Sequence, residues 1–168
     1  MIELAGQVFT LVTAGDHDGI RAVQAVLESD PATYALLEGA PPRADEAALL
    51  VEETPPGVPP ERKQVWVSET CVIDLVSGYP DAATWYLGLL FLAPHARNGG
   101  LGTRLVHAIV DFVRARGGHA LRLAVVSTNV GARRLYDRLG FTHVARRQRQ
   151  TSGLQQDVDV LELRFQAS

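Results

Sequence analysis

The chain has 168 residues, of which 46% are hydrophobic and 21% charged, and its formal net charge is −3 at pH 7. These values favour one domain, residues 1–168, and lack the basic excess of a dedicated nucleic-acid binder. No run approaches the roughly 18 apolar residues that span a bilayer, and the N-terminus does not resemble a signal peptide. We therefore expect a cytoplasmic protein that uses neither nucleic acid nor a membrane as partner.

Alternation and helical spacing predict the elements of the first half. A strand is expected at residues 7–13, with helices at 20–29, from Asp30-Pro31 to about 38, and at 44–51. The proline-rich segment 55–60 cannot continue a helix and is expected to form a loop. Two strands at 65–67 and 71–76 are expected to form a hairpin, the second of them edge-like near Asp74.

The second half begins with an apolar strand at residues 85–92, a Gly-rich turn and an amphipathic helix that ends near Arg116. A buried strand follows at 121–126, and because a helix of about 15 residues joins the two strands, they are expected to run parallel. The remaining elements are a helix from Thr128-Asn129 to Gly140 and two strands around Gly153, at 141–149 and 157–165. The predicted fold is α/β, with a mixed sheet and helices on both faces.

The turn at residues 97–103 reads Arg97-Asn98-Gly99-Gly100-Leu101-Gly102-Thr103. Three glycines within four residues allow positive φ angles and leave no Cβ atoms in the way of a close ligand. The first N–H groups of the next helix have no partners inside it, and together with the helix dipole they attract an anion. The turn therefore predicts a ligand that carries phosphate.

Two common nucleotide-binding motifs do not fit this turn. A Walker loop needs Gly-Lys-Ser/Thr where the chain has Gly102-Thr103-Arg104. A dinucleotide fingerprint starting at Gly100 needs Gly or Ala where Leu105 stands, and it needs an acidic residue about 20 positions later, which the strand at 121–126 does not offer.

A different family fits better. The pattern Arg97-x-x-Gly100-x-Gly102 follows a strand that ends at Pro94, and about 30 residues later comes Asn129-x-x-Ala132-x-x-Leu135-Tyr136-x-x-x-Gly140-Phe141. Together these segments resemble the GNAT superfamily of acyl-CoA-dependent N-acyltransferases. The resemblance covers residues 65–141 and implies a central, mostly antiparallel mixed sheet with one splayed parallel strand pair.

The resemblance also implies a cofactor site. The pyrophosphate of coenzyme A would lie on the N–H groups of the turn, and the pantetheine arm would follow the open backbone of the preceding strand. Asn129 either bonds the pantetheine or caps its helix, and Arg133 either reaches the phosphates or stays solvated. The residues expected to bind acetyl-CoA are Leu90, Phe91, Leu92, Arg97, Asn98, Gly99, Gly100, Leu101, Gly102, Thr103, Asn129 and Arg133.

Tyr136 is the expected catalytic acid, because a phenol with a pKa of about 10 held near the sulfur can protonate the leaving thiolate. The alternative is that Tyr136 only packs against the cofactor. The base that takes the amine's proton is expected to be Asp74 or Asp81, with further candidates in Glu52, Glu53 and His95. The histidines show no metal-site spacing, so no metal is expected.

The resemblance predicts an enzyme that transfers an acetyl group from acetyl-CoA to a primary amine, by direct attack in a ternary complex. The amine would belong to a small molecule or a peptide, and the helices around Tyr34 with the loop 55–60 would wall its site. The alternative function is a non-catalytic acyl-CoA sensor or subunit. Exposed strand edges near the C-terminus permit a homodimer, and the basic cluster at 146–149 is expected to be either a solvated face or one that protects an edge. Cys71, the one cysteine, is expected to be a small core residue.

Overall fold

The computed structural model describes residues 1–151 and 154–166, and within them the chain forms an eight-stranded mixed sheet in the order β1-β2-β3-β4-β5-β6-β8-β7. The strands are β1 (Ile2–Leu4), β2 (Gln7–Val12), β3 (Lys63–Val67), β4 (Cys71–Ser77), β5 (Thr84–Leu92), β6 (Ala120–Val126), β7 (Thr142–Thr151) and β8 (Leu154–Arg164). The helices are α1 (His17–Glu28), α2 (Pro31–Glu38), α3 (Glu46–Glu52), α4 (Leu101–Ala115) and α5 (Val130–Arg138), with short 3-10 turns at Pro60–Arg62 and Pro94–Ala96. Among the described helices, none is long and apolar enough to cross a membrane.

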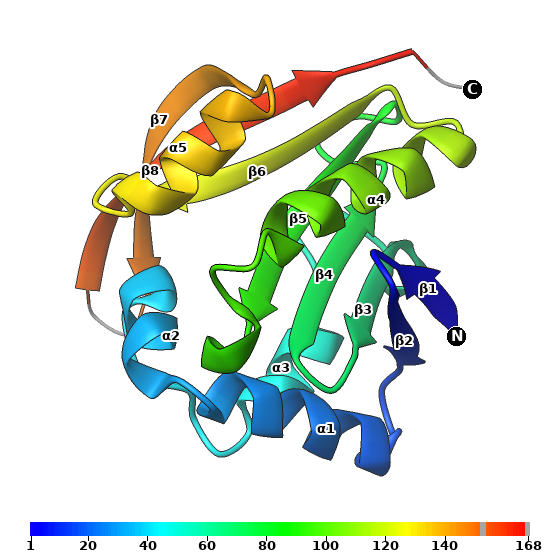
Figure 1. The fold of residues 1–168 in the computed structure, drawn as a ribbon, viewed down its shortest axis with the longest axis vertical. Helices are drawn as coiled ribbons and strands as arrows, with labels where there is room; N and C mark the ends of the chain where they lie inside the picture. Colours follow the sequence, from blue (N-terminus) through cyan, green and yellow to red (C-terminus); the bar gives the residue numbers. More distant parts are fainter. Residues whose placement is uncertain (152–153, 167–168) are drawn as a thin grey trace.

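The strand directions confirm the predicted fold class. Strands β5 and β6 are parallel, while the other neighbouring strands in the sheet are antiparallel. Helix α4 is the crossover between β5 and β6, as a parallel pair requires (Figure 1). The sheet is therefore mostly antiparallel with one parallel pair.

Two apolar cores lie on opposite faces of the sheet. Residues of α4 such as Leu105 and Ile109 are fully buried in one core, together with Trp66 and Ile73 from the strands. The other core contains residues of α1 and α2 packed against alternate strand positions, among them Phe91. Helices thus cover both faces (Figure 1), because each face of the sheet is apolar along its centre.

A bulge in β5 changes which face its side chains occupy. Leu87 belongs to the core under α4 and Leu89 to the opposite core, although residues two apart in a regular strand share a face. The register explains this, since Asp74 pairs with Leu89 while the next residue, Leu75, pairs with Leu87. Gly88 is therefore the extra residue of the bulge. A Cβ atom at Gly88 would lie 2.6 Å from Oδ2 of Asp74, so any other residue here would have to displace this carboxylate.

Beyond the bulge, the parallel strands part. They pair only over residues 84–87 of β5 and 120–123 of β6. Further along, β5 remains paired with β4 up to Leu92, and β6 remains paired with β8 up to Val126. The sheet therefore splits along one line, and the facing backbone edges of β5 and β6 lack their sheet partners there.

The expectation of an edge strand near Asp74 is wrong. Strand β4 lies inside the sheet between β3 and β5, and Asp74 is 5% exposed. Its Oδ2 lies 3.1 Å from Nζ of Lys63 on β3, an ion pair that permits a carboxylate in an internal strand.

Strand β1, a three-residue strand that pairs with β2, is not among the elements predicted from the sequence. Cys71 is fully buried, as expected. The turn expected around Gly153 lies outside the described residues.

Replacing Gly88 with Ala is expected to lower the free energy of unfolding by about 1–3 kcal/mol, because the new Cβ atom must displace the buried Asp74 carboxylate. Urea denaturation measures this change. Gly99→Ala is the matched control, since a Cβ atom there meets nothing within 4 Å. Equal stability of the two variants would contradict the role of Gly88.

Candidate active site

The split between β5 and β6 opens into a cavity of about 490 Å³, which we call the split cavity. Its walls are the parted ends of the two strands, the start of α4 and one face of α5. The lining residues are Thr33, Leu37, Glu38, Tyr86, Leu87, Gly88, Leu89, Leu90, Phe91, Leu92, Arg97, Asn98, Gly102, Leu123, Ala124, Val125, Val126, Asn129, Gly131, Ala132, Leu135, Tyr136 and Arg149.

The Gly-rich turn lies at the end of this cavity. Two of its residues have left-handed backbone, Gly100 with φ 77° and Asn98 with φ 65°. The glycines in the sequence thus predict one of these two left-handed residues, Gly100. The other is an Asn, which adopts left-handed backbone more readily than most residues. Gly100 is the N-cap of α4 and supplies no side-chain hydrogen bond to the first turn. The N–H groups of that turn are therefore available to an anion.

Arg97 fastens the turn to the other half of the molecule. Its Nε donates to the carbonyl oxygen of Leu92 at 2.9 Å, and its Nη1 lies 2.7 Å from Oδ2 of Asp30. Asp30 also caps α2 through the N–H of Thr33, and its pKa is lowered to about 2 by hydrogen bonds from Thr33 and Arg97. The guanidinium lines the cavity, but these contacts already use part of its donor capacity.

Tyr136 comes to the split cavity from α5. Its residue is 8% exposed and its ring packs edge-to-face on Phe141 with centroids 5.3 Å apart. Burial raises the pKa of Tyr136 to about 12, so the phenol keeps its proton throughout the physiological range. The hydroxyl has no hydrogen-bonding partner within the described part of the chain and is available to a ligand.

Asn129 also lines the split cavity and caps α5. Its side chain accepts a hydrogen bond from the N–H of Ala132 at 3.2 Å. The capping role expected from sequence is therefore present, and the amide nitrogen of the same side chain remains available as a donor.

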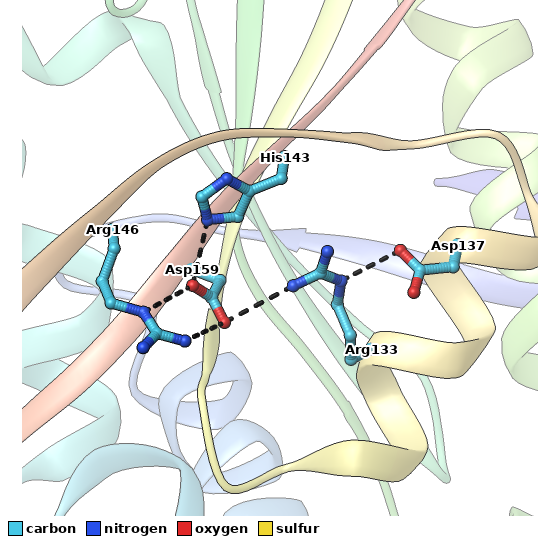
Figure 2. Close-up of polar contacts among 5 residues, drawn as sticks. All are labelled: Arg133, Asp137, His143, Arg146 and Asp159. Atoms are coloured by element: carbon cyan, nitrogen blue, oxygen red, sulfur yellow. Dashed lines mark hydrogen bonds and ion pairs between the residues drawn. The ribbon is translucent and has the colours of Figure 1, made fainter.

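Arg133 lies on α5, and its side chain points toward an ionic cluster (Figure 2). Its Nε lies 2.9 Å from Oδ1 of Asp137, and its Nη1 lies 3.4 Å from Oδ2 of Asp159. The Asp159 carboxylate also receives Nε of Arg146 at 3.0 Å and contacts Nε2 of His143 at 3.0 Å. Hydrogen bonds from Arg146, and then from His143, lower the pKa of Asp159. The cluster joins α5 to the last two strands.

A second cavity of about 290 Å³, which we call the acidic cavity, lies between the sheet and helices α2 and α3. Tyr34 and Pro55, expected to wall an acceptor site, both line it. Its lining residues are Tyr34, Glu38, Glu46, Leu49, Leu50, Glu53, Thr54, Pro55, Lys63, Asp74, Val76, Tyr86, Gly88 and Leu89. Four residues belong to both cavities, namely Glu38, Tyr86, Gly88 and Leu89.

The expected bases fall in different places. Asp74 lines the acidic cavity and is ion-paired with Lys63, and burial raises its pKa. Asp81 instead accepts hydrogen bonds from the N–H of Ala83 and the hydroxyl of Thr84 in a turn, and it lines neither cavity. Thus the structure brings Asp74 to the site and leaves Asp81 outside it.

Glu38 lines the candidate site but is not among the site residues predicted from the sequence. It ends α2, lines both cavities, and its pKa is raised by burial. An acidic residue at a helix C-terminus interacts unfavourably with the helix dipole. This placement of Glu38 was the feature of the sequence that could have indicated a functional role.

Arg149 was expected to belong to a solvated or edge-protecting cluster, but it is half-buried and lines the split cavity. It donates to the carbonyl oxygen of Leu37 and to Oε1 of Gln156, and its Nη1 lies 3.8 Å from Oε2 of Glu38. Gln156 in turn donates to the carbonyl oxygen of Leu36 at 3.3 Å. Strands β7 and β8 thus reach α2 across the open end of the split, as Figure 1 shows for β7.

The described residues contain no group of three or more His, Cys, Asp or Glu side chains placed to hold a metal ion. The polar groups that converge on the cavities include an open helix N-terminus, the phenols of Tyr34, Tyr86 and Tyr136, and several carboxylates. These groups suit a phosphate-bearing ligand beside a site for proton transfer.

Comparison with known proteins agrees with this chemistry. The chain belongs to the acetyltransferase (GNAT) family, whose sequence model matches residues 24–141. The match includes the turn, the split strands and α5.

Individual proteins match the chain either over a short segment or at low sequence identity. Over 66 residues the chain is 44% identical to the mycothiol acetyltransferase of Beutenbergia cavernae, a match that covers 39% of this chain and only 22% of that protein's length. The ribosomal-protein-S18-alanine N-acetyltransferase of Escherichia coli has a similar structure, with 17% identity, 96% of each chain covered and a TM-score of 0.69. An acetyltransferase from Thermus thermophilus matches at 21% identity over 93% of this chain and 97% of its own, with a TM-score of 0.65.

The Asp159 cluster generates a prediction about stability and pH. Because the pKa of Asp159 is lowered in the folded state, its charge stabilises the fold above the unfolded pKa of about 3.9, and this contribution is lost as pH falls further. Asp159→Asn is expected to lower the free energy of unfolding at pH 7 by about 2 kcal/mol.

The difference between Asp159→Asn and the unaltered protein should begin to shrink below about pH 4, where the unfolded carboxyl takes up a proton, and should vanish once the pH falls below the lowered pKa of the folded state. Chemical denaturation at several pH values measures it. Asp157→Asn, an exposed change two residues away on the same strand, is the control and should have little effect. A difference that does not vary with pH would contradict the ionic role of Asp159.

Proposed function

We propose that the protein transfers an acetyl group from acetyl-CoA to a primary amine, by direct attack in a ternary complex. One observation carries this proposal: the split cavity and the acidic cavity meet at Glu38, Tyr86, Gly88 and Leu89. A thioester in the first and an amine in the second can therefore touch without a covalent enzyme intermediate. The GNAT family generally uses acetyl-CoA, which supports the choice of donor.

The turn and the split strand are the proposed binding surface for acetyl-CoA. The N–H groups of residues 98–103 would bind the pyrophosphate, because the first turn of α4 has no side-chain cap. The open backbone of Leu90, Phe91 and Leu92 would pair with the amides of the pantetheine arm. Asn129, which lines the same cavity, has a free amide donor for that arm.

Arg97 and Arg133 take a smaller part in this proposal than the sequence suggested. Arg97 holds the turn in place through Asp30 and Leu92, while its backbone remains part of the turn. The Arg133 guanidinium is engaged by Asp137 and Asp159, so we assign it to the positioning of α5.

Tyr136 is the proposed acid. As the amine nitrogen bonds to the acetyl carbon and the carbon–sulfur bond breaks, Tyr136 gives its proton to the sulfur. A phenol with a pKa of about 12 is a weak acid for a thiolate in water, but a thiolate formed in the same buried cavity also has a raised proton affinity. The same buried cavity therefore raises the proton affinity of both the Tyr136 phenolate and the thiolate, so that the proton can pass from the phenol to the sulfur.

Glu38 is the proposed base. It borders both cavities, and its raised pKa gives the carboxylate a greater affinity for the proton that the attacking nitrogen must lose. Asp74 is less suited, because Lys63 holds one of its oxygens. After each turnover, the proton on Glu38 passes to solvent and Tyr136 regains one, so that acetylated amine and free coenzyme A are the net products.

The Tyr136→Phe variant tests this assignment. We expect its turnover number to fall by about 10² to 10⁴-fold, because the proton donor is lost, while its affinity for acetyl-CoA changes little. Release of coenzyme A in the presence of an amine gives the rate, and calorimetry gives the affinity. Tyr79→Phe, which changes a tyrosine outside both cavities, should retain full activity. Undiminished turnover in Tyr136→Phe would refute the acid role.

A further inference from the structure

A second tyrosine, Tyr86, lies where the split cavity and the acidic cavity meet, and it lines both. Its neighbours along β5, Trp85 and Leu87, belong to the core under α4. Because side chains alternate along a strand, the Tyr86 side chain lies on the opposite face of the sheet. That face carries the core to which α2 and α3 contribute, so Tyr86 faces the acceptor side of the proposed reaction.

Contacts on both sides hold the Tyr86 ring in place. The ring of Tyr79, in the turn before β5, packs edge-to-face against it with centroids 5.5 Å apart. On the neighbouring strand β4, Val76 is the residue directly paired with Tyr86. A half-buried ring with these contacts is already oriented, so it loses little freedom when a ligand binds.

The Tyr86 hydroxyl is available to a ligand. It makes no hydrogen bond to residues 1–151 or 154–166, the parts of the chain that the structure describes. It is also not among the described polar atoms that lack both a partner and contact with solvent, a group that includes Oδ1 of Asp74. Burial, followed by the nearby Tyr79, raises the pKa of Tyr86, so the phenol keeps its proton at neutral pH and can donate a hydrogen bond.

The proposed binding mode of acetyl-CoA brings the acetyl group to this residue. A pyrophosphate on the turn at 98–103 and a pantetheine arm along residues 90–92 define a path that runs back along β5 toward the start of the split. The acetyl group at the end of this path reaches Gly88 and Leu89, where the two cavities meet. Because of the bulge at Gly88, Leu89 lies on the same face of the sheet as Tyr86.

The reaction needs a hydrogen-bond donor at this point. When the amine attacks, negative charge develops on the acetyl oxygen, and a donor fixed beside that oxygen lowers the barrier. The residues that line both cavities are Glu38, Tyr86, Gly88 and Leu89. Glycine has no side chain, leucine is apolar, and an ionised Glu38 only accepts. Among these four side chains, Tyr86 therefore supplies the donor.

We propose that Tyr86 is a further catalytic residue, whose hydroxyl donates a hydrogen bond to the acetyl oxygen and stabilises the negative charge that develops there. Tyr136, from the core under α4, and Tyr86, from the opposite face, then act on the sulfur and on the oxygen respectively. The Tyr86 proton stays on its own oxygen throughout, so the products and the proton balance are unchanged. This inference rests on the proposed function, because it adds a residue to the same reaction.

The infrared carbonyl band of bound acetyl-CoA, labelled with heavy carbon at the thioester carbonyl, tests this contact without any amine. A hydrogen bond to the oxygen weakens the carbonyl bond, so the band of the Tyr86→Phe variant should lie at higher wavenumber than that of the unaltered protein. Tyr79→Phe is the matched control and should leave the band in place, because Tyr79 packs on Tyr86 but lines neither cavity. An identical band in Tyr86→Phe and the unaltered protein would overturn the inference.

Tyr86→Phe should also lower kcat for acetyl transfer to butylamine, a simple primary amine, by about 10²- to 10³-fold. The Kd of acetyl-CoA should stay within about three-fold of its unaltered value, because the interaction strengthens only in the transition state. The pH profile of the remaining rate should keep its shape, since the base is still present. A pH profile that loses its basic or acidic limb would assign Tyr86 to proton transfer and overturn the inference.

Calorimetry with acetyl-CoA separates this inference from the proposed function. A folded protein that does not bind acetyl-CoA would refute the proposed function, and the inference with it. Binding of acetyl-CoA and transfer to butylamine, with the carbonyl band and kcat unaffected by Tyr86→Phe, would overturn the inference alone. Loss of the hydroxyl should not unfold the protein, because it has no hydrogen-bonding partner in the described residues, and thermal unfolding of the variant checks this.

Discussion

The separation of β5 from β6 determines how the rest of the structure is used. The strands are hydrogen-bonded over residues 84–87 and 120–123, and each then follows its other neighbour instead. The bulge at Gly88 accompanies this change, because it moves Leu89 to the opposite face and makes room for the Asp74 carboxylate. A continuous sheet would satisfy more backbone groups internally, so the open edges are the feature of this fold that most needs a ligand.

Because the sheet is split, other contacts must hold the two halves of the molecule in position relative to each other. On one side, Arg97 joins the turn before α4 to Asp30 at the start of α2. Arg149 joins the last strands to Leu37 at the other end of that helix. Helix α2 is therefore fixed at both ends, and Glu38 is held where the two cavities meet. The proposed proton acceptor thus depends on contacts between segments far apart in the sequence.

Local patterns in the sequence predicted the fold well. Hydrophobic periodicity and the glycines located the strand, turn and helix around Gly100, and the length of that helix predicted the parallel pair. Long-range partners were not predictable in the same way. The neighbours of Arg97, Glu38 and Arg149 lie on other elements, and the ion pair that allows Asp74 inside the sheet comes from a different strand. No single segment encodes these contacts, because tertiary packing creates them.

The central claim is that the turn and the split bind an acyl-CoA. Thermal unfolding with and without acetyl-CoA tests it directly, since a ligand at about 100 times its Kd should add roughly 2.7 kcal/mol to the free energy of unfolding. NAD at the same concentration is the control, because it has a pyrophosphate but no pantetheine arm. The account predicts a clear rise in Tm with acetyl-CoA and little with NAD. A folded protein whose Tm does not respond to acetyl-CoA would contradict it.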